Sequence, residues 1–482
     1  MTEHYDVVIV GTSFAASFFL MRYLEHASPT ARILVLERGN NDTKAWQMAN
    51  RRNSSIEPTT AFESDNPQKF WRITLGFGGN SKCWMGGATR MMPGDFELRS
   101  RYGVGTDWPI SYDDLEHHYG IAERVMLVSG PPDSPMPRST PFPLPPHRLS
   151  DPEVLLKKRF PDGWYQMATA RASVANSQRG VCCSTGLCGL CPVDAKFTIQ
   201  NGLAYIYEDP RVVLRLRSEV QTIGTFAGVA KSVDYLQDGA VKTVAGDLIV
   251  LGANGAFNPH ILLRSGFDHP LIGRRLHEQM SVSVTLDLKG VKCYNGSSAL
   301  SGLGYLFYDG QHRRDHAACM IEVWNSPFAN NPGDTLRLES GRWNERMLLG
   351  FLFDDLPSDE NTVAVSPNNP RMARLHFTDH SDYAKRGAKQ IPRMLDKLSE
   401  VLPIERVVTA SWASAAHIQG TVVMGNDPAT SVVDRHLIHH KCRNLLVLGS
   451  SSYPTASPAY PTLTISALSL WAADHVLGRD VS

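Results

Sequence analysis

The sequence has no apolar run long enough to cross a lipid bilayer. Its longest apolar stretches, Ser13–Met21 and Met347–Phe353, fall well short of the roughly 20 residues that a membrane-spanning helix needs. The first residues also lack the basic start and the apolar core of a secretory signal. We therefore expect no membrane span and a cytoplasmic location.

Neither sign of charge is in excess. The 482 residues include 48 Lys+Arg and 48 Asp+Glu, which gives a formal net charge of zero. There is no run of like charge and no repeat with the period of a solenoid protein. The sequence therefore predicts no basic surface for a nucleic acid.

The eight cysteines do not read as a disulfide framework, because a cytoplasmic location keeps thiols reduced. Four of them stand close together, at Cys182, Cys183, Cys188 and Cys191. Two ligand pairs with nearly this spacing occur in zinc and iron–sulfur sites. A loop that simply buries its cysteines gives the same pattern, so the spacing alone leaves both interpretations open.

Several short apolar segments, far apart in the sequence, have the composition of buried parallel strands. Each is apolar on both faces and is followed closely by a glycine. These segments are Asp6–Val10, Ile33–Glu37, Leu248–Leu251 and Leu445–Leu448. They predict one α/β domain assembled from separated parts of the chain.

A different pattern occupies the middle of the sequence. Ser281–Gly310 and His316–Phe353 alternate apolar and polar residues, which is typical of antiparallel strands. Ser381–Leu402 has helical periodicity, and the Pro- and Ser-rich stretch Ser129–Pro146 reads as a loop. We expect an α/β fold, α+β overall, in which a domain with an antiparallel sheet is inserted into the first domain.

The first strand runs into a degraded version of the turn that binds dinucleotides. Gly11 allows a tight turn, while Ser13 and Ala16 stand where glycines are usual. Small residues here let backbone amides approach a pyrophosphate at a helix N-terminus. Glu37 ends the next strand, where an acidic side chain binds ribose hydroxyls. The turn predicts a bound dinucleotide but does not distinguish FAD from NAD.

The C-terminal part of the chain contains a more specific pattern. Residues 416–425 read Ala-His-Ile-Gln-Gly-Thr-Val-Val-Met-Gly, and the blocks Asn444–Ser451 and Pro461–Ile465 follow. Together with the earlier blocks Gly76–Ser81, Trp108–Leu115 and Ile272–Glu278, this order resembles the glucose–methanol–choline (GMC) oxidoreductases. It looks most like the branch that contains pyranose 2-oxidase and gluconate dehydrogenase.

The resemblance implies a fold and a cofactor. A Rossmann-like FAD-binding domain would consist of residues 1–96, 174–284 and 411–482, and a substrate-binding domain of residues 97–173 and 285–410. It also assigns residues to the FAD site. Those expected to contact FAD are Gly11, Ser13, Phe14, Ala15, Ala16, Glu37, Arg38, Gly78, Gly79, Asn80, Ser81, Cys83, Trp84, Met85, Val220, Ala253, Gly449, Ser450, Pro461, Thr462 and Leu463.

Two residues carry the chemistry that the resemblance implies. His417 matches the position of the base that takes the proton of a substrate hydroxyl while hydride leaves the adjacent carbon for flavin N5. Tyr460 stands where the family usually has Asn or a second His. A phenol can donate the same hydrogen bond, so our hypothesis gives Tyr460 the role of the amide. It could instead shape an aromatic pocket or impair alcohol oxidation.

Cys83 stands where some relatives attach FAD covalently through a histidine. We expect noncovalent FAD, with Cys83 as a small residue against the flavin, although a cysteinyl bond is conceivable.

Relatives also carry a Cys- and Gly-rich segment that ends in Cys-Pro, as Cys191-Pro192 does here. On that resemblance we expect a buried loop and no metal.

The resulting prediction is an FAD-dependent enzyme that oxidises an alcohol group, on a sugar or glycoside, to a carbonyl. Electrons would pass to oxygen, a quinone or a protein. One alternative is an FAD-containing lyase on the same fold, and another is a noncatalytic flavoprotein subunit. The sequence does not predict the substrate itself or the oligomeric state.

Overall fold

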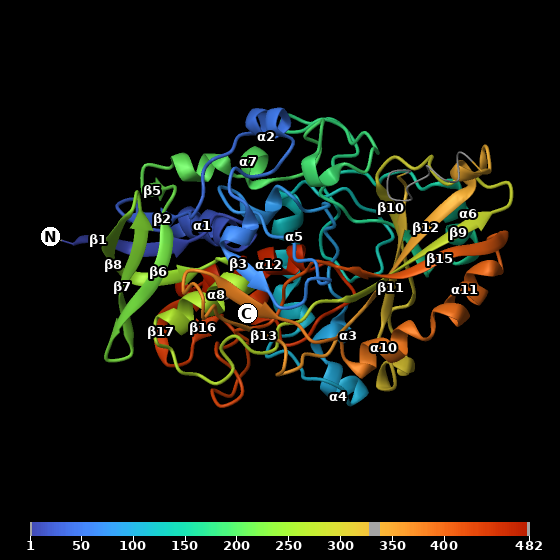
Figure 1. Cartoon of the computed structure of the whole chain (residues 1–482). Helices are drawn as coiled ribbons and strands as arrows, with labels where there is room; N and C mark the ends of the chain where they lie inside the picture. Colours follow the sequence, from blue (N-terminus) through green and yellow to red (C-terminus); the bar gives the residue numbers. More distant parts are fainter. Residues whose placement is uncertain (1, 327–337, 480–482) are drawn as a thin grey trace.

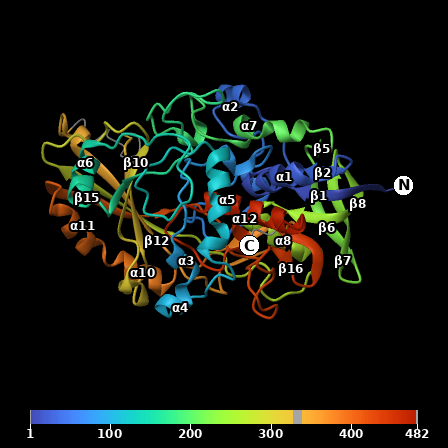
Figure 2. The same cartoon turned by 180° about the vertical axis from the view of Figure 1, so that it is seen from behind.

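The computed structural model describes residues 2–326 and 338–479. These residues form three sheets, of eight, six and three strands. Figures 1 and 2 show the eight-stranded sheet at one end of an elongated molecule and the six-stranded sheet at the other, with helices and loops between them. The expected combination of an α/β region with an antiparallel sheet region is confirmed.

The eight-stranded sheet contains all four predicted parallel strands. Its main path is β16-β17-β8-β1-β2-β5, in which the pairs from β17 to β5 are parallel, and the antiparallel pair β6-β7 joins it through β8. The strands are β1 (Glu3–Val10), β2 (Ile33–Leu36), β5 (Val212–Arg215), β6 (Glu219–Phe226), β7 (Val229–Gln237), β8 (Ala240–Leu251), β16 (Ile438–His439) and β17 (Cys442–Val447). Segments far apart in sequence thus build one sheet.

Close contact between β1 and β8 explains the small residues at their ends. Gly11 follows β1 with φ +97°, and a Cβ there would lie 2.7 Å from the carbonyl oxygen of Gly252. A Cβ on Gly252 would in turn meet the Cβ of Ala16 at 2.9 Å. Side chains at either glycine would force the helix that follows β1 away from the sheet.

The six-stranded sheet has the order β15-β9-β12-β11-β10-β4, and all its pairs are antiparallel. Its strands are β4 (Trp164–Gln166), β9 (Met280–Leu288), β10 (Leu300–Phe307), β11 (Cys319–Trp324), β12 (Arg346–Phe353) and β15 (Ile404–Ser414). The strands predicted in Ser281–Gly310 and His316–Phe353 are confirmed where the structure describes them; residues 327–337 lie outside the described residues.

The small third sheet pairs strands from distant parts of the chain. Its strands are β3 (Phe62–Ser64), β13 (Thr362–Val365) and β14 (Ala373–His376).

The division of the chain into two domains stays a prediction. Two of its limits, after residues 284 and 410, fall inside β9 and β15, so these two paired strands connect the regions without an intervening loop.

Helices cover the sheets and fill the space between them. They are α1 (Phe14–His26), α2 (Lys44–Asn50), α3 (Pro93–Phe96), α4 (Leu98–Tyr102), α5 (Tyr112–Val125), α6 (Asp151–Arg159), α7 (Ile199–Gly202), α8 (Asn254–Arg264), α10 (Asp382–Ala388), α11 (Ile391–Ser399) and α12 (Pro461–Val476). Helix α12 packs against α1 and α5, and its sides are buried nearly all round. Within the described ranges, no helix has the length and apolar character to span a membrane.

The single helix predicted over Ser381–Leu402 is wrong in one respect. The structure has two helices there, α10 and α11, which are separated at Lys389 and Gln390. Pro392 lies in the first turn of α11, where its missing N–H costs nothing; inside a continuous helix it would break a backbone hydrogen bond. The loop predicted over Ser129–Pro146 is confirmed, since no helix or strand falls within it.

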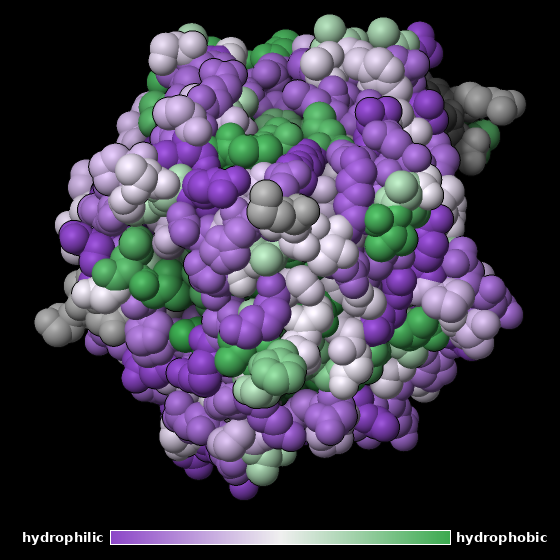
Figure 3. Space-filling view, turned by 90° about the vertical axis from the view of Figure 1, so that its left-hand side faces the viewer, coloured by the Kyte–Doolittle hydropathy of each residue, from purple (hydrophilic) through white to green (hydrophobic). Residues whose placement is uncertain are grey.

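The surface at the outer end of the eight-stranded sheet is mixed in character. Figure 3 shows hydrophobic side chains there only in small, separated areas among hydrophilic ones. Isolated exposed apolar residues such as Phe226 and Val241 are ordinary on a folded protein. The larger feature for function lies inside the molecule, between the two main sheets.

Candidate active site

A cavity of about 610 Å³ runs from the C-terminal ends of the parallel strands to one face of the six-stranded sheet. At one end it is lined by the turn after β1, by Glu37 after β2 and by the start of α8. At the other end it is lined by residues of β9, β10, β11 and β12, by the segment that follows β15, and by the start of α12. This is the position in which open α/β sheets bind ligands.

The turn after β1 presents a helix N-terminus to the cavity. Ser13 is the N-cap of α1, with φ −86°, so the positive φ falls on Gly11 and Ser13 is unstrained. The Ser13 side chain makes no capping hydrogen bond, which leaves the first amides of α1 without a side-chain acceptor. A pyrophosphate satisfies such amides and is stabilised by the helix dipole.

Glu37 lines the same end and also holds the turn together. Its carboxylate accepts hydrogen bonds from the Thr12 hydroxyl at 2.6 Å and from the amides of Gly39 and Gly76 at 2.9 and 3.1 Å. Two carboxylate oxygens offer about four acceptor positions. One position therefore stays open for a ribose hydroxyl, as the sequence predicts.

Positive charge gathers beyond Glu37. Arg38 and Arg371 both reach the carboxylate of Glu219, and Arg38 also stacks over the ring of Phe257 with 5.7 Å to its centroid. Arg264 lines the cavity beside them. Burial lowers the pKa of Arg38, although it remains a cation. Three guanidinium groups around one carboxylate leave this end of the cavity net positive, which suits a phosphate-bearing cofactor.

Most of the predicted FAD contacts come together in this one cavity. The predicted residues that line it are Gly11, Ser13, Phe14, Ala15, Glu37, Arg38, Gly79, Asn80, Cys83, Trp84, Met85, Val220, Ala253, Gly449, Ser450, Pro461 and Thr462. The remaining four, Ala16, Gly78, Ser81 and Leu463, are absent from the lining. Gly78 and Ser81 instead fix the loop, since Gly78 donates to Thr12 and Ser81 donates to the Gly78 carbonyl.

The loop that contains Cys83 is anchored from behind. Trp84 donates through its indole N–H to the Phe197 carbonyl at 2.8 Å, and the buried Lys196 donates to the carbonyls of Lys82, Trp84 and Cys188. The thiol of Cys83 contacts the Asn80 carbonyl at 3.5 Å. The loop therefore presents a fixed wall to the cavity.

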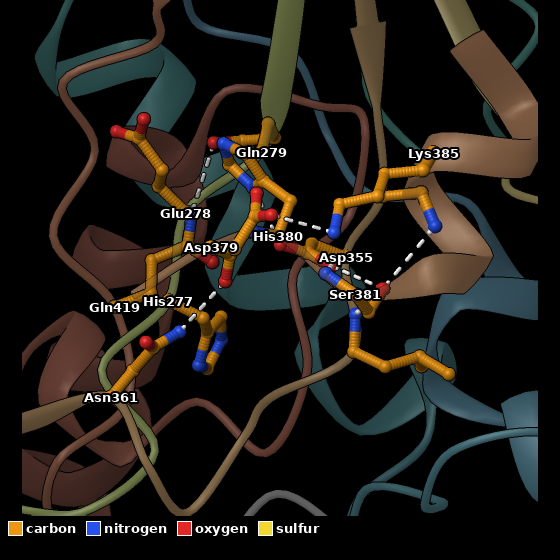
Figure 4. A network of polar contacts seen from close by, with 12 residues as sticks. His277, Glu278, Gln279, Asp355, Asn361, Asp379, His380, Ser381, Lys385 and Gln419 are labelled. Carbon is orange, nitrogen blue, oxygen red and sulfur yellow. Dashed lines mark hydrogen bonds and ion pairs between the residues drawn. The ribbon is translucent and has the colours of Figure 1, made fainter. Parts of the chain in front are cut away.

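His417 lies at the other end of the cavity, where two segments pair. His277 and Gln419 form an antiparallel bridge, so Gln279, two residues after His277, comes opposite His417, two residues before Gln419. Nδ1 of His417 lies 3.0 Å from Oε1 of Gln279. Gln419 donates to the same Oε1 at 3.1 Å, and Figure 4 shows Gln279 and Gln419 within this network of polar contacts.

The hydrogen bonds of Gln279 determine the tautomer of His417. The amide nitrogen of Gln279 donates to the carbonyl of Ala459 at 2.7 Å, so its oxygen is the atom that faces His417. Nδ1 must then carry the proton, and Nε2 keeps its lone pair. The described residues provide no hydrogen-bond partner for Nε2, and His417 lines the cavity.

Burial lowers the pKa of His417 to about 4, and the positive charges of Arg72 and Lys69 act in the same direction. The imidazole is therefore neutral at pH 7 and available as a base. Glu278 supports the segment, because it accepts from the His417 amide at 3.1 Å and pairs with the buried Lys69. A neutral, fixed imidazole is what proton removal from an alcohol requires.

Tyr460 stands beside His417, with ring centroids 6.1 Å apart and planes at 78°. Its hydroxyl donates to the carboxylate of Glu322 on β11, and its amide donates to Thr89 at 3.1 Å. The sequence hypothesis had the phenol donate to substrate; the structure shows a protein acceptor for that proton. Tyr460 is also the N-cap of α12, whose first residues Pro461 and Thr462 line the cavity.

Sequence reasoning missed Thr12, Arg72, Gln279 and Glu322. Two of them carry a signal in the sequence. Gln279 directly follows the block Ile272–Glu278, and Glu322 is a charged residue inside the otherwise apolar strand β11. A charge within a buried strand often has a functional reason.

The four clustered cysteines have different environments. Cys183 is exposed, Cys182 is half-buried near the Ser298 hydroxyl, and Cys188 and Cys191 are buried. Within the described part of the chain, no three His, Cys, Asp or Glu side chains gather as metal ligands would. The absence of a metal stays a prediction.

Comparisons with known proteins agree with this geometry. A family model described as GMC oxidoreductase matches residues 357–469, which include His417 and Tyr460. The chain is 25% identical to the fructose dehydrogenase large subunit of Gluconobacter japonicus over 98% of this chain and 97% of that protein. It is also 25% identical to the gluconate 2-dehydrogenase flavoprotein of Pantoea cypripedii, over 83% and 78% of the two chains.

The chain is similar to the GMC oxidoreductases, whose family model covers residues 357–469 of it. Its fold agrees with that of pyridoxine 4-oxidase from Mesorbium loti, with a TM-score of 0.68 at 16% identity over 98% of this chain and 99% of that one. GMC oxidoreductases bind FAD. The residues present fit that group, because an uncapped helix N-terminus, a free acceptor on Glu37 and a second helix N-terminus at Pro461 line one continuous cavity.

Proposed function

We propose that the protein is a GMC oxidoreductase that oxidises a secondary or primary hydroxyl of a sugar or glycoside, with His417 as the base. FAD, when bound, supplies the hydride acceptor at N5. Nε2 of His417 takes the hydroxyl proton, since it is the unprotonated nitrogen of a neutral ring. The single observation that carries the proposal is the contact between the Gln279 amide oxygen and Nδ1 of His417. Because Nδ1 then carries the proton, Nε2 keeps its lone pair in the cavity.

The substrate class rests on two supports. The relatives include proteins named for fructose and gluconate. The substrate end of the cavity combines aromatic side chains, Tyr460 and Trp324, with the polar groups of Ser281, Ser283 and Glu322. Aromatic faces with a few polar groups between them suit a molecule with apolar C–H faces and hydroxyl edges.

We also propose that FAD is held without a covalent bond. Cys83 is buried, and its thiol already contacts the Asn80 carbonyl at 3.5 Å, as a small residue that packs into the cavity wall would. The electron acceptor stays a choice between oxygen, a quinone and a protein, and the cytoplasmic location stays a prediction.

An anaerobic flavin-reduction screen tests the function. The purified holoprotein is mixed with sugars, methyl glycosides and simple alcohols, and the flavin absorbance is followed. We expect bleaching by at least one sugar or glycoside. A flavin that no alcohol reduces would support the lyase or the noncatalytic subunit instead.

A further inference from the structure

Glu322 is a buried carboxyl group that faces the same cavity as His417. It is 6% exposed, lies in the middle of the six-stranded sheet on β11, and lines the cavity. Its neighbours on the strand, Ile321 and Val323, are buried in the opposite, apolar side of the sheet. The side chain therefore points from the sheet toward the substrate end of the cavity.

Two donors fix the carboxylate. Oε2 accepts from the Tyr460 hydroxyl, and Oε1 accepts from the Trp324 indole N–H at 2.8 Å. Each carboxylate oxygen has two acceptor positions, so one position remains on each. Since Tyr460 and Trp324 can only donate in these contacts, the group that they hold offers acceptors, and not donors, to a ligand.

Two glycines leave room for this pair. A Cβ on Gly350 of β12 would lie 2.5 Å from Oε1 of Glu322. A Cβ on Gly87 would lie 2.6 Å from Cδ2 of the Tyr460 ring. Neither glycine has a positive φ, so it is space, and not backbone conformation, that requires glycine at both positions.

Tyr460 connects the base and the carboxylate. Its ring stands edge-on to His417, and its hydroxyl is bonded to Glu322. A molecule that places one hydroxyl at Nε2 of His417 therefore occupies a cavity that Tyr460 and Glu322 also line. A substrate with a second hydroxyl on a neighbouring carbon can donate that hydrogen to Glu322.

The charges around the base argue against a cationic substrate. Burial is the main cause that lowers the pKa of His417, and the charges of Arg72 and Lys69 add to it, so these two groups contribute a positive potential at the base. Arg72 lines the cavity and donates to the Cys83 carbonyl at 3.3 Å. An ammonium group on the substrate would meet this potential, whereas an uncharged hydroxyl would not.

We propose that Glu322, held by Tyr460 and Trp324, is the specificity-determining residue that accepts a hydrogen bond from a second hydroxyl next to the one that is oxidised. The substrate is thus an uncharged vicinal polyol. This inference rests on the proposed function of the site and adds the feature of the substrate that the site recognises.

Matched alcohols test the proposal. Anaerobic flavin reduction by trans-cyclohexane-1,2-diol and by cyclohexanol is measured for the wild-type holoenzyme and for Glu322→Gln, together with dissociation constants from the flavin difference spectrum. We expect the wild type to prefer the diol. In Glu322→Gln that preference falls by about 10- to 100-fold, as expected for the loss of a hydrogen bond to a charged group.

A matched control is Glu153→Gln. Glu153 is fully buried and accepts from Ser150 and Ser301, yet it does not line the cavity, so its substitution should leave the preference unchanged. A second variant, Tyr460→Phe, loosens the carboxylate and should lower the preference by a smaller factor. If Glu322→Gln does not fold, the Tyr460→Phe variant still tests whether the held carboxylate sets the preference.

Three outcomes contradict the proposal. They are an equal preference in wild type and Glu322→Gln, a wild type that does not distinguish the two alcohols, and tighter binding of trans-2-aminocyclohexanol than of the diol. If neither alcohol reduces the flavin, the proposed oxidation fails for these compounds, while the ratio of dissociation constants still decides the role of Glu322.

Discussion

The amide oxygen of Gln279 and Nδ1 of His417 lie 3.0 Å apart, and this contact fixes both the orientation and the tautomer of the imidazole. Gln279 is held in turn by the Ala459 carbonyl and by Gln419. The orientation of the base therefore depends on Gln279, an amide side chain that does not itself take up the proton.

Replacing Gln279 should slow flavin reduction while FAD stays bound. In Gln279→Leu the imidazole loses the acceptor that holds its N–H. We expect the rate with a reactive alcohol to fall by about fivefold, the equivalent of one hydrogen bond of about 1 kcal/mol. Stopped-flow absorbance under anaerobic conditions measures this rate.

Gln279→Glu is the matched control, because it keeps an acceptor for Nδ1–H. Its added negative charge should raise the pKa of His417 and move the acid limb of the rate profile to higher pH. A Gln279→Leu variant as fast as wild type would show that the contact does not position the base.

The pH dependence of the reaction follows from the same group. Because the pKa of His417 is lowered to about 4, the ring is the free base above that value. We expect the rate constant for flavin reduction to be level above pH about 5 and to fall as the pH drops through about 4. Arg72→Gln removes a nearby positive charge, so it should move this limb upward by about 0.5 pH unit.

The rate profile is measured by stopped-flow reduction at constant ionic strength. An acid limb near the ordinary histidine pKa of about 6.5, unmoved by Arg72→Gln, would contradict the environment described for His417. Lys289→Gln serves as the charge control, because Lys289 is exposed and does not line the cavity, so this substitution should leave the acid limb unmoved.

The turn after β1 should not tolerate a Cβ at Gly11. Gly11→Ala combines an unfavourable φ of +97° with an approach of 2.7 Å to the Gly252 carbonyl. We expect the purified variant to contain little flavin, measured as the ratio of flavin to protein absorbance. Gly103→Ala is the control, because Gly103 has φ +77° and open space around it.

The Gly103→Ala control separates the effect of the positive φ from the effect of the close approach to Gly252. Gly103→Ala should cost about 1–2 kcal/mol of folding stability through its backbone alone and keep a full complement of flavin. If Gly11→Ala also kept its flavin, the close contact between the turn and β8 would not be needed for the cofactor.

The flavin should leave the protein when it is denatured. Acid precipitation of the wild type is expected to release the yellow colour into the supernatant, because Cys83 is a buried thiol next to a carbonyl. Colour that stays in the pellet of the wild type and leaves the pellet of Cys83→Ala would establish a cysteinyl bond and contradict noncovalent binding.

Much of the fold was accessible from the sequence. The buried strands were recognisable because each is apolar on both faces and ends near a glycine, and β2 is indeed buried at all four positions. The helix break at Pro392 was missed, since the periodicity continues across it and only the proline marks a new first turn. The pairing of β3 with β14 was also out of reach, because short strands carry little pattern.

The residues of the candidate site were likewise predictable only in part. Residues in contiguous blocks, such as Ser13 and His417, were predictable because their neighbours identify them. Gln279 and Glu322 carry only a weak local signal, and their roles depend on contacts with residues more than a hundred positions away, which the sequence does not reveal. The partner of the Tyr460 hydroxyl likewise became visible only once β11 had been placed beside α12.

The most direct test of the account is anaerobic flavin reduction by one reactive sugar or glycoside in wild type and His417→Gln, with flavin content and thermal unfolding measured in parallel. The account predicts that both proteins bind FAD and fold, and that the variant is slower by about 10²- to 10⁴-fold, the usual contribution of a general base. A His417→Gln variant that reduces its flavin as fast as the wild type would contradict it.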